Sequence, residues 1–231
     1  MRRQLSRVLS AALPKEWPFK MRAITKLRPY IAPFEWVLAA GEGLPLVVDI
    51  GCGSGGLSFL LLSVGRVGRV VGIDPDPIAV ARAQMLLMSQ SPPLDFKLQV
   101  AESPVAIAPD IMLADAIVMC DVLHHIPADQ QRDFLRQIAS LMKPGAKFII
   151  KDIDASRRIL VWFNRLHDWI MTGARGDERT ISDVVSYLSA VDLTIESCQS
   201  GRRLWYPHYQ IVFIKNSFGG LERSNGLEAS A

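Results

Sequence analysis

From residue 46 onward, short runs of β-branched and other apolar residues alternate with longer segments whose apolar residues recur every three or four positions. The longer segments are typical of helices that bury one face. Alternation of strands and helices favours an α/β fold with a mostly parallel sheet. The short runs predict seven strands, at residues 46–50, 69–73, 96–100, 116–120, 147–152, 193–197 and 210–215.

Start and stop signals locate three of the predicted helices. Asp76 can cap a helix whose first residue is Pro77, and Ile78, Ala81, Met85 and Met88 then recur at helical spacing. A second helix, with Phe134, Ile138 and Leu141, must end at the Lys143-Pro144-Gly145 turn. A third helix begins at a predicted capping box formed by Thr180 and Asp183.

The chain of 231 residues is long enough for one sizeable core, and its 49% apolar and 21% charged residues indicate a globular protein. We expect a basic helical arm over residues 1–44 and the main domain over 45–215, with a helical insertion at 156–179. Residues 216–231 contain few apolar side chains and predict a flexible tail.

The three cysteines and the hydropathy pattern suggest a cytoplasmic protein. Cys52, Cys120 and Cys198 are far apart and lack metal-ligand spacing, so they indicate reduced thiols and no zinc site. The longest apolar run, residues 57–64, is far shorter than the roughly 18 residues that cross a bilayer.

Basic residues are concentrated at the start of the chain. Residues 1–30 contain eight lysines and arginines and only one acidic residue, Glu16, whereas the whole chain has a net charge of +3. The excess indicates either peripheral contact with an anionic membrane or substrate, or simply a solvated helix face.

The residues between 47 and 56 carry the clearest chemical signal. A buried-type strand ends at Ile50 and is followed by a glycine-rich turn, whose backbone a nucleoside ligand can approach closely. The spacing of Gly51, Gly53 and Gly56 also matches the dinucleotide fingerprint. Asp49 favours a cationic ligand over a pyrophosphate, because unit charges about 4 Å apart interact by roughly 4 kcal/mol at an effective dielectric near 20.

The segment Asp49-Ile50-Gly51-Cys52-Gly53-Ser54-Gly55 resembles the first motif of class I S-adenosylmethionine-dependent methyltransferases. Residues 114–118, 122–126 and 141–145 resemble that family's fourth strand, the segment after it, and the turn before strand five. The resemblance implies a Rossmann-like three-layer sandwich, with a seven-stranded, mostly parallel sheet and helices on both faces.

The resemblance also implies how the cofactor, S-adenosyl-L-methionine, is bound. Gly51, Cys52 and Gly53 would line its methionine and ribose parts, Asp49 would attract its cationic end, and Asp74 would accept hydrogen bonds from both ribose hydroxyls.

The adenine end of the cofactor is expected near the second and third strands. Pro75 would lie against the adenine ring. The family has a Gly-Asp pair after its third strand, where this chain has Ala101 and Glu102, so Glu102 is the candidate for the adenine amino group.

The transferred methyl group is expected at the end of the fourth strand, where open α/β sheets bind ligands. Cys120 and Asp121 lie there and His124 and His125 follow. His125 is the better candidate for a general base, because an ordinary imidazole titrates near pH 6.5. The alternative is that the two histidines are structural.

We expect a small, hydrophobic or lipid-like acceptor. Apolar residues of segment 156–172 recur on one helical face and predict either a lid over the acceptor or part of the core. Four polar residues are further candidates for the acceptor pocket, namely His167, Asp168, Tyr206 and His208.

Other functions remain open at this point. A nicotinamide-dependent Rossmann oxidoreductase and a non-catalytic cofactor-binding module are the alternatives. Nucleic acid is not an expected partner, because the Pro-Pro-Tyr or Pro-Pro-Trp signature of amino-directed nucleic-acid methyltransferases is absent. Nothing in the sequence indicates an oligomeric state.

Overall fold

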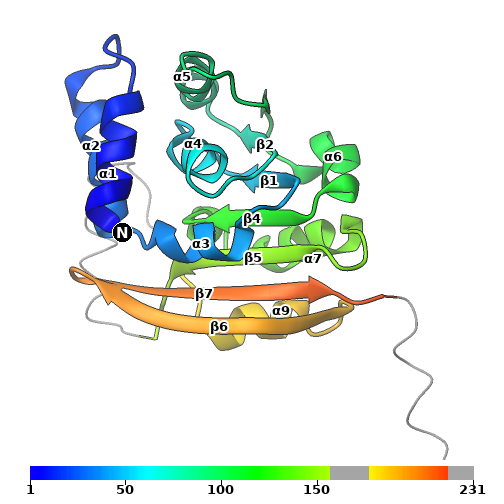
Figure 1. The fold of residues 1–231 in the computed structure, drawn as a ribbon. Helices are drawn as coiled ribbons and strands as arrows, with labels where there is room; N and C mark the ends of the chain where they lie inside the picture. Colours follow the sequence, from blue (N-terminus) through cyan, green and yellow to red (C-terminus); the bar gives the residue numbers. More distant parts are fainter. Residues whose placement is uncertain (157–176, 218–231) are drawn as a thin grey trace, which may run out of the picture.

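The computed structural model describes residues 1–156 and 177–217 and contains one seven-stranded sheet (Figure 1). The strand order is β3-β2-β1-β4-β5-β7-β6. β1 to β5 pair in parallel, and β7 pairs antiparallel with both β5 and β6. The strands are β1 (Leu46–Ile50), β2 (Arg69–Asp74), β3 (Phe96–Val100), β4 (Ala116–Cys120), β5 (Lys147–Ile153), β6 (Leu193–Arg203) and β7 (Tyr206–Lys215).

Helices cover both faces of this sheet, and each face has its own hydrophobic cluster. On one face lie α1 (Arg2–Ala12), α3 (Phe34–Gly41), α4 (Gly56–Ser63) and α5 (Pro77–Met88). On the other lie α6 (Ala108–Leu113), α7 (Gln131–Leu141) and α9 (Ile181–Leu188). The sequence-based prediction of a three-layer, Rossmann-like α/β fold with a mostly parallel sheet is confirmed.

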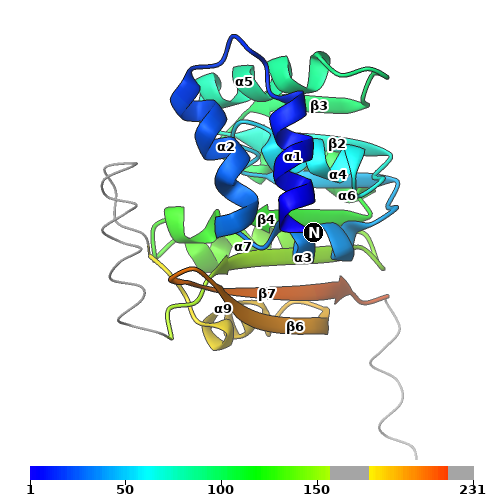
Figure 2. The same cartoon turned by 60° about the vertical axis from the view of Figure 1, so that its left-hand side comes forward.

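The basic N-terminal segment folds against the domain. α1 and α2 (Phe19–Ile31) lie side by side, and α3 follows (Figures 1 and 2). Leu5, Leu9 and Trp17 are buried in the same cluster as α4 and β1. The division of the chain at residue 45 stays a prediction.

The last two strands are longer than the sequence pattern predicts. We expected strands at 193–197 and 210–215, but β6 and β7 pair as far as Arg203 and Tyr206. Residues 198–203 are mostly polar and do not alternate between apolar and polar, so the sequence does not predict a strand there. In the structure, backbone pairing with β7 extends the strand through these residues.

The helix start signals are confirmed, but the expected face of α5 is wrong. Asp76 accepts a hydrogen bond from the backbone of Ile78, and Thr180 and Asp183 form the predicted capping box. Ile78, Met85 and Met88 are exposed, however, and the buried residues of α5 are Ala79, Val80, Ala83, Leu86 and Leu87.

Short turns complete the described part of the chain. The 3₁₀ turns η1 (Pro104–Ile107) and η2 (Leu123–His125) follow β3 and β4.

Among residues 1–156 and 177–217, every helix is too short or too polar to cross a membrane. The predicted lid at 156–172, apart from Ser156, and the tail from 218 lie outside the described residues, as do His167 and Asp168.

Candidate functional site

The glycine-rich turn joins the carboxyl end of β1 to α4. Gly51 has φ +74°, and a Cβ there would lie only 2.3 Å from Cγ2 of Val122. Gly55 has φ +78°, and its Cβ would lie 2.8 Å from Cβ of Ala83. These two glycines are required by the packing of the turn itself. Gly53 has φ +53° with open space beside it, so a ligand can approach the backbone there.

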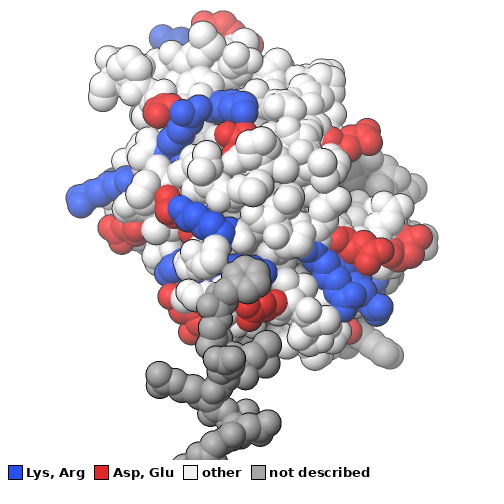
Figure 3. All heavy atoms as spheres, turned by 90° about the vertical axis from the view of Figure 1, so that its right-hand side faces the viewer, with Lys and Arg blue, Asp and Glu red and all other residues white. Residues whose placement is uncertain are grey.

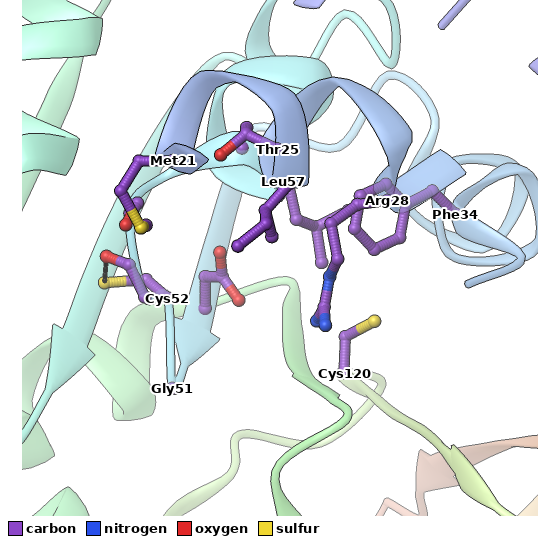
Figure 4. Close-up of a pocket in the computed structure, with 13 residues that line it drawn as sticks. Met21, Thr25, Arg28, Phe34, Gly51, Cys52, Leu57 and Cys120 are labelled. Atoms are coloured by element: carbon purple, nitrogen blue, oxygen red, sulfur yellow. Dashed lines mark hydrogen bonds between the residues drawn. The ribbon is translucent and has the colours of Figure 1, made fainter. Parts of the chain in front are cut away.

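A cavity of about 410 Å3 opens on this turn. Helix α2 passes over it, and Arg28 extends from α2 toward Cys120 (Figure 4). The turn and strand ends contribute Asp49, Gly51, Cys52, Gly53, Ser54, Gly56, Leu57 and Cys120, while the N-terminal helices contribute Met21, Ile24, Thr25, Arg28 and Phe34.

Asp49 places a carboxyl group in the wall of this cavity. Its side chain is buried, and Oδ2 accepts a hydrogen bond from Oγ of Ser58 at 2.5 Å. Burial raises the pKa of Asp49 to about 7, because removal from water disfavours the charged form, and the Ser58 hydroxyl offsets part of that effect. Asp49 is therefore poised to ionise near neutral pH, where a cationic ligand would favour its charged form.

Arg28 brings the opposite charge into the same cavity. Its guanidinium Nη2 lies 3.4 Å from Oδ2 of Asp121, and its side chain remains half-exposed. The other oxygen of Asp121 contacts Nζ of the fully buried Lys151. Burial alone would raise the pKa of Asp121, but Lys151 and Arg28 outweigh it and hold that pKa well below its usual value. Asp121 thus has two countercharges, the buried Lys151 and the half-exposed Arg28.

Asp74 lies at the end of β2 and supports the glycine turn. Its Oδ2 accepts a hydrogen bond from the backbone N–H of Gly53, and its Oδ1 accepts one from that of Asp76, both at 2.9 Å. The carboxylate remains partly exposed, so its other lone pairs can accept from a ligand.

The structure brings together five of the predicted cofactor residues in this cavity, Asp49, Gly51, Cys52, Gly53 and Cys120. Burial raises the pKa of both cysteine thiols, so neither is a ready nucleophile. The remaining predicted residues do not line the cavity, namely Asp74, Pro75, Ala101, Glu102, Asp121 and His125. Ala101 nevertheless lies beside Asp74, since its N–H donates to the Asp74 carbonyl at 3.1 Å.

The two adjacent histidines have different surroundings. His124 is buried, and its Nδ1 lies 2.5 Å from Oδ1 of Asp152. Burial would raise the pKa of Asp152, but contact with His124 outweighs it and lowers that pKa. His125 is exposed, with its ring 4.0 Å from that of His124. The geometry makes His124 a buried structural contact and leaves His125 as the histidine whose side chain reaches the surface.

Tyr206 and His208, predicted near the acceptor, are both buried at the start of β7 and do not line this cavity. His208 Nε2 donates to the carbonyl of Ile31 at 2.8 Å, which ties β7 to the end of α2. Burial and Lys151 lower the pKa of His208 to about 3, so this imidazole is neutral.

Sequence reasoning did not identify the residues that α2 contributes to the site. Met21, Ile24, Thr25 and Arg28 recur at helical spacing on one face, but their contact with the glycine turn depends on how α2 folds back. The excess of basic residues in this segment was the available signal.

Two bacterial ubiquinone biosynthesis O-methyltransferases are similar to this chain in sequence. The chain is 34% identical over 139 residues to ubiquinone biosynthesis O-methyltransferase of Methylobacterium sp. (strain 4-46), covering 55% of this chain and 53% of that protein. It is 32% identical over 124 residues to the same enzyme of Aeromonas salmonicida (strain A449), covering 52% of this chain and 49% of that protein. The matches thus span about half the length of these relatives.

Structural comparison and a family match extend the likeness over most of the chain. Magnesium protoporphyrin IX methyltransferase from Synechocystis PCC 6803 with bound SAH has a TM-score of 0.61 at 17% identity, covering 89% of this chain and 91% of that chain. Residues 1–197 match the family described as "Methyltransferase domain". The chain therefore belongs to the methyltransferase domain family, which confirms the class I methyltransferase resemblance of its glycine turn and later motifs.

Proposed function

We propose that this protein transfers a methyl group from S-adenosylmethionine to an oxygen atom of a small, hydrophobic or lipid-like acceptor. The single observation that carries the proposal is the pair of opposite charges, Asp49 and Arg28, in one cavity on the glycine turn. The methionine end of the cofactor carries an ammonium and a carboxylate; the Asp49 carboxylate can accept from the ammonium, and the Arg28 guanidinium can donate to the carboxylate. Open space beside Gly53 suits a ligand that approaches the backbone.

In this proposal the residues of the chain bind and orient the cofactor. Asp49 holds the ammonium group, and Arg28 exchanges Asp121 for the carboxylate of the cofactor. Asp74 accepts hydrogen bonds from the ribose hydroxyls while it braces Gly53. The bound cofactor supplies an activated methyl group on a sulfonium, so alignment and exclusion of water contribute more than a strong catalytic side chain.

The remaining predicted site residues belong to the same proposal. Pro75, Ala101 and Glu102 lie on the β2 and β3 side and would border the adenine. Cys120 and Asp121 would border the transferred methyl group at the end of β4. His125 would act as general base for the acceptor hydroxyl, since its side chain is exposed beside the β4 end.

The choice of acceptor rests on the proteins that this chain resembles. Two relatives are named for O-methyl transfer in ubiquinone biosynthesis, and a structural neighbour is named for a porphyrin. Family membership argues against a nicotinamide-dependent oxidoreductase.

Peripheral membrane contact through the basic N-terminal helices is part of the proposal. A cytoplasmic location is also part of it, in keeping with three free thiols.

Calorimetric titration of the full chain tests the cofactor assignment. We expect saturable binding of S-adenosylmethionine and of its demethylated product, and no binding of NAD. Binding of NAD alone would refute the proposal. Binding of S-adenosylmethionine without release of the demethylated product, across a panel of phenolic and lipid-like acceptors, would instead indicate a non-catalytic cofactor-binding module.

A ligand lacking the carboxylate tests the role of Arg28. Arg28→Gln should weaken binding of S-adenosylmethionine roughly 10- to 100-fold, because a hydrogen bond to a charged group contributes about 1.5 to 3 kcal/mol. Binding of decarboxylated S-adenosylmethionine should be nearly unchanged by the same substitution. Equal losses for the two ligands would show that Arg28 acts through the fold and not on the carboxylate.

A further inference from the structure

Helix α2 has two faces with different surroundings. Its inner face carries Met21, Ile24, Thr25 and Arg28 into the cavity. Since successive helical residues are about 100° apart, six residues fall in an arc of about 120° on the opposite side. They are Phe19, Lys20, Ala23, Lys26, Leu27 and Tyr30. In that arc Phe19 is 85% exposed and Leu27 is 50% exposed. Large apolar side chains are therefore presented to solvent directly behind the wall of the site.

A second segment, distant in sequence, presents apolar residues at the same end of the molecule. Leu204 and Trp205 form the turn between β6 and β7 and are 58% and 47% exposed. Figures 1 and 2 both place this turn at the end of the sheet where α2 lies. A hydrogen bond connects α2 to the strand that follows this turn, because His208 of β7 donates to the Ile31 carbonyl at the end of α2.

Most of the exposed charges around these residues are positive. Lys15, Lys20, Lys26 and Arg202 are exposed, and none of them has an ion pair within the described part of the chain. Glu16 is the single acidic residue in the first 30. The opposite end of the molecule differs, since Figure 3 shows Lys and Arg interleaved there with Asp and Glu.

We infer that the outer face of α2 and the β6–β7 turn form a docking surface for an anionic lipid bilayer. Phe19, Leu27, Leu204 and Trp205 would enter the interface, and the surrounding lysines and Arg202 would contact lipid phosphates. Exposed aromatic side chains flanked by unpaired basic residues match the chemistry of such an interface. A protein partner of average surface would offer both signs of charge and fits this predominantly positive surface less well.

This inference rests on the proposed function for its purpose. A hydrophobic acceptor dissolves in the bilayer, and α2 is the element that separates the docked surface from the cavity. Docking would therefore place the acceptor beside the wall that carries Arg28 and Met21. The site would be filled from the membrane instead of from water.

Co-sedimentation of the full chain with lipid vesicles tests the docking surface. We expect binding to vesicles that contain phosphatidylglycerol and much weaker binding to vesicles of phosphatidylcholine alone. Lys20→Gln combined with Lys26→Gln should reduce the partition coefficient about 25-fold, since each basic residue near the surface contributes about fivefold. Phe19→Ser combined with Trp205→Ser should reduce it at least tenfold, roughly the loss for one large apolar side chain.

A matched pair of exposed apolar residues at the other end provides the control. Met112 and Leu113 on α6 are 57% and 67% exposed, and Met112→Ser with Leu113→Ser should leave vesicle binding unchanged. Equal loss in this control would overturn the assigned surface, and so would failure of the wild type to bind anionic vesicles. Thermal melts and S-adenosylmethionine titrations without vesicles show whether each variant is folded, and they keep failure of docking distinct from failure of the proposed function.

Discussion

Asp49→Asn should stabilise the ligand-free protein above pH 7 and, at the same pH, weaken its binding of the cofactor. The Asp49 carboxyl group is buried, and among residues 1–156 and 177–217 its one polar side-chain partner is the Ser58 hydroxyl. Asparagine keeps an oxygen that can accept from Ser58 and carries no charge. The substitution therefore removes the cost of a buried anion together with the attraction for a cationic ligand.

The stability effect follows from the pKa. Burial raises the pKa of Asp49 from 3.8 to about 7, and each pH unit between the folded and unfolded values corresponds to about 1.4 kcal/mol. The unfolded chain loses this proton first, so the stability contribution of Asp49 is greatest below pH 4. It falls as the pH rises to about 7 and is constant above. Between pH 4 and pH 7 the free energy of unfolding of the wild type should fall by about 4 kcal/mol as an upper bound. Asp49→Asn has no carboxyl group at this position and should not show this fall.

The binding effect has the opposite direction. A unit charge pair about 4 Å apart is worth roughly 4 kcal/mol at an effective dielectric near 20. Wild-type affinity for S-adenosylmethionine should therefore rise with pH through the titration of Asp49 near 7. The ligand's own ionisations are common to both proteins, so the difference between wild type and Asp49→Asn isolates the carboxylate.

Urea unfolding and calorimetric titration at pH values from 5 to 9, on both proteins, measure the two effects. Ser58→Ala serves as a second perturbation. It removes a hydrogen bond to the charged form worth about 1.5 to 3 kcal/mol, so the pH at which affinity rises should move up by one to two pH units. The reasoning is refuted if the stability difference between wild type and Asp49→Asn is the same at pH 5 and pH 8, or if both bind the cofactor equally at pH 8.

Three further predictions concern residues around the site. Gly51→Ala should lower the free energy of unfolding by about 1 to 3 kcal/mol because of its positive φ, and further because of the clash with Val122. It should also lower the affinity for the cofactor. Adding Val122→Ala should restore part of the stability, measured by urea denaturation, and part of the affinity, measured by calorimetry. Asp121→Asn should cost about 3 to 5 kcal/mol by leaving Lys151 buried without its anion, and adding Lys151→Met should recover most of it, so a wild-type urea midpoint for the single variant would contradict the pairing. Asp74→Asn should weaken S-adenosylmethionine binding by roughly 1.5 to 3 kcal/mol but weaken its 2′-deoxy analogue less, and an equal loss would assign Asp74 to bracing the turn alone.

Local sequence patterns were sufficient for the core of the fold and for the part of the cavity that the glycine turn forms. The strand ending at Ile50, the glycine turn and Asp49 follow one another in the chain, so their geometry is set by neighbours in sequence. The caps at Asp76 and Thr180 are equally local. These features were predictable because a turn or a cap needs only a few consecutive residues of the right type.

The orientation of α5 was not predictable in this way. Apolar residues occur around most of that helix, so periodicity alone offers two candidate faces. Contact with the sheet selected the face with Val80, Ala83 and Leu87 and left Met85 and Met88 exposed.

By itself, the sequence determined the α/β class, the alternation of strands and helices along the chain, and the glycine turn with its acidic neighbour. Only the tertiary structure decided that α2 lies over that turn and brings Arg28 into the cavity, 21 residues before Asp49 in sequence. It also decided that Lys151, an ordinary charged residue in the chain, is buried against Asp121. The physical reason is that turns and caps are stabilised within a few residues, whereas the position of a helix and the pairing of a buried charge depend on packing between segments far apart in sequence.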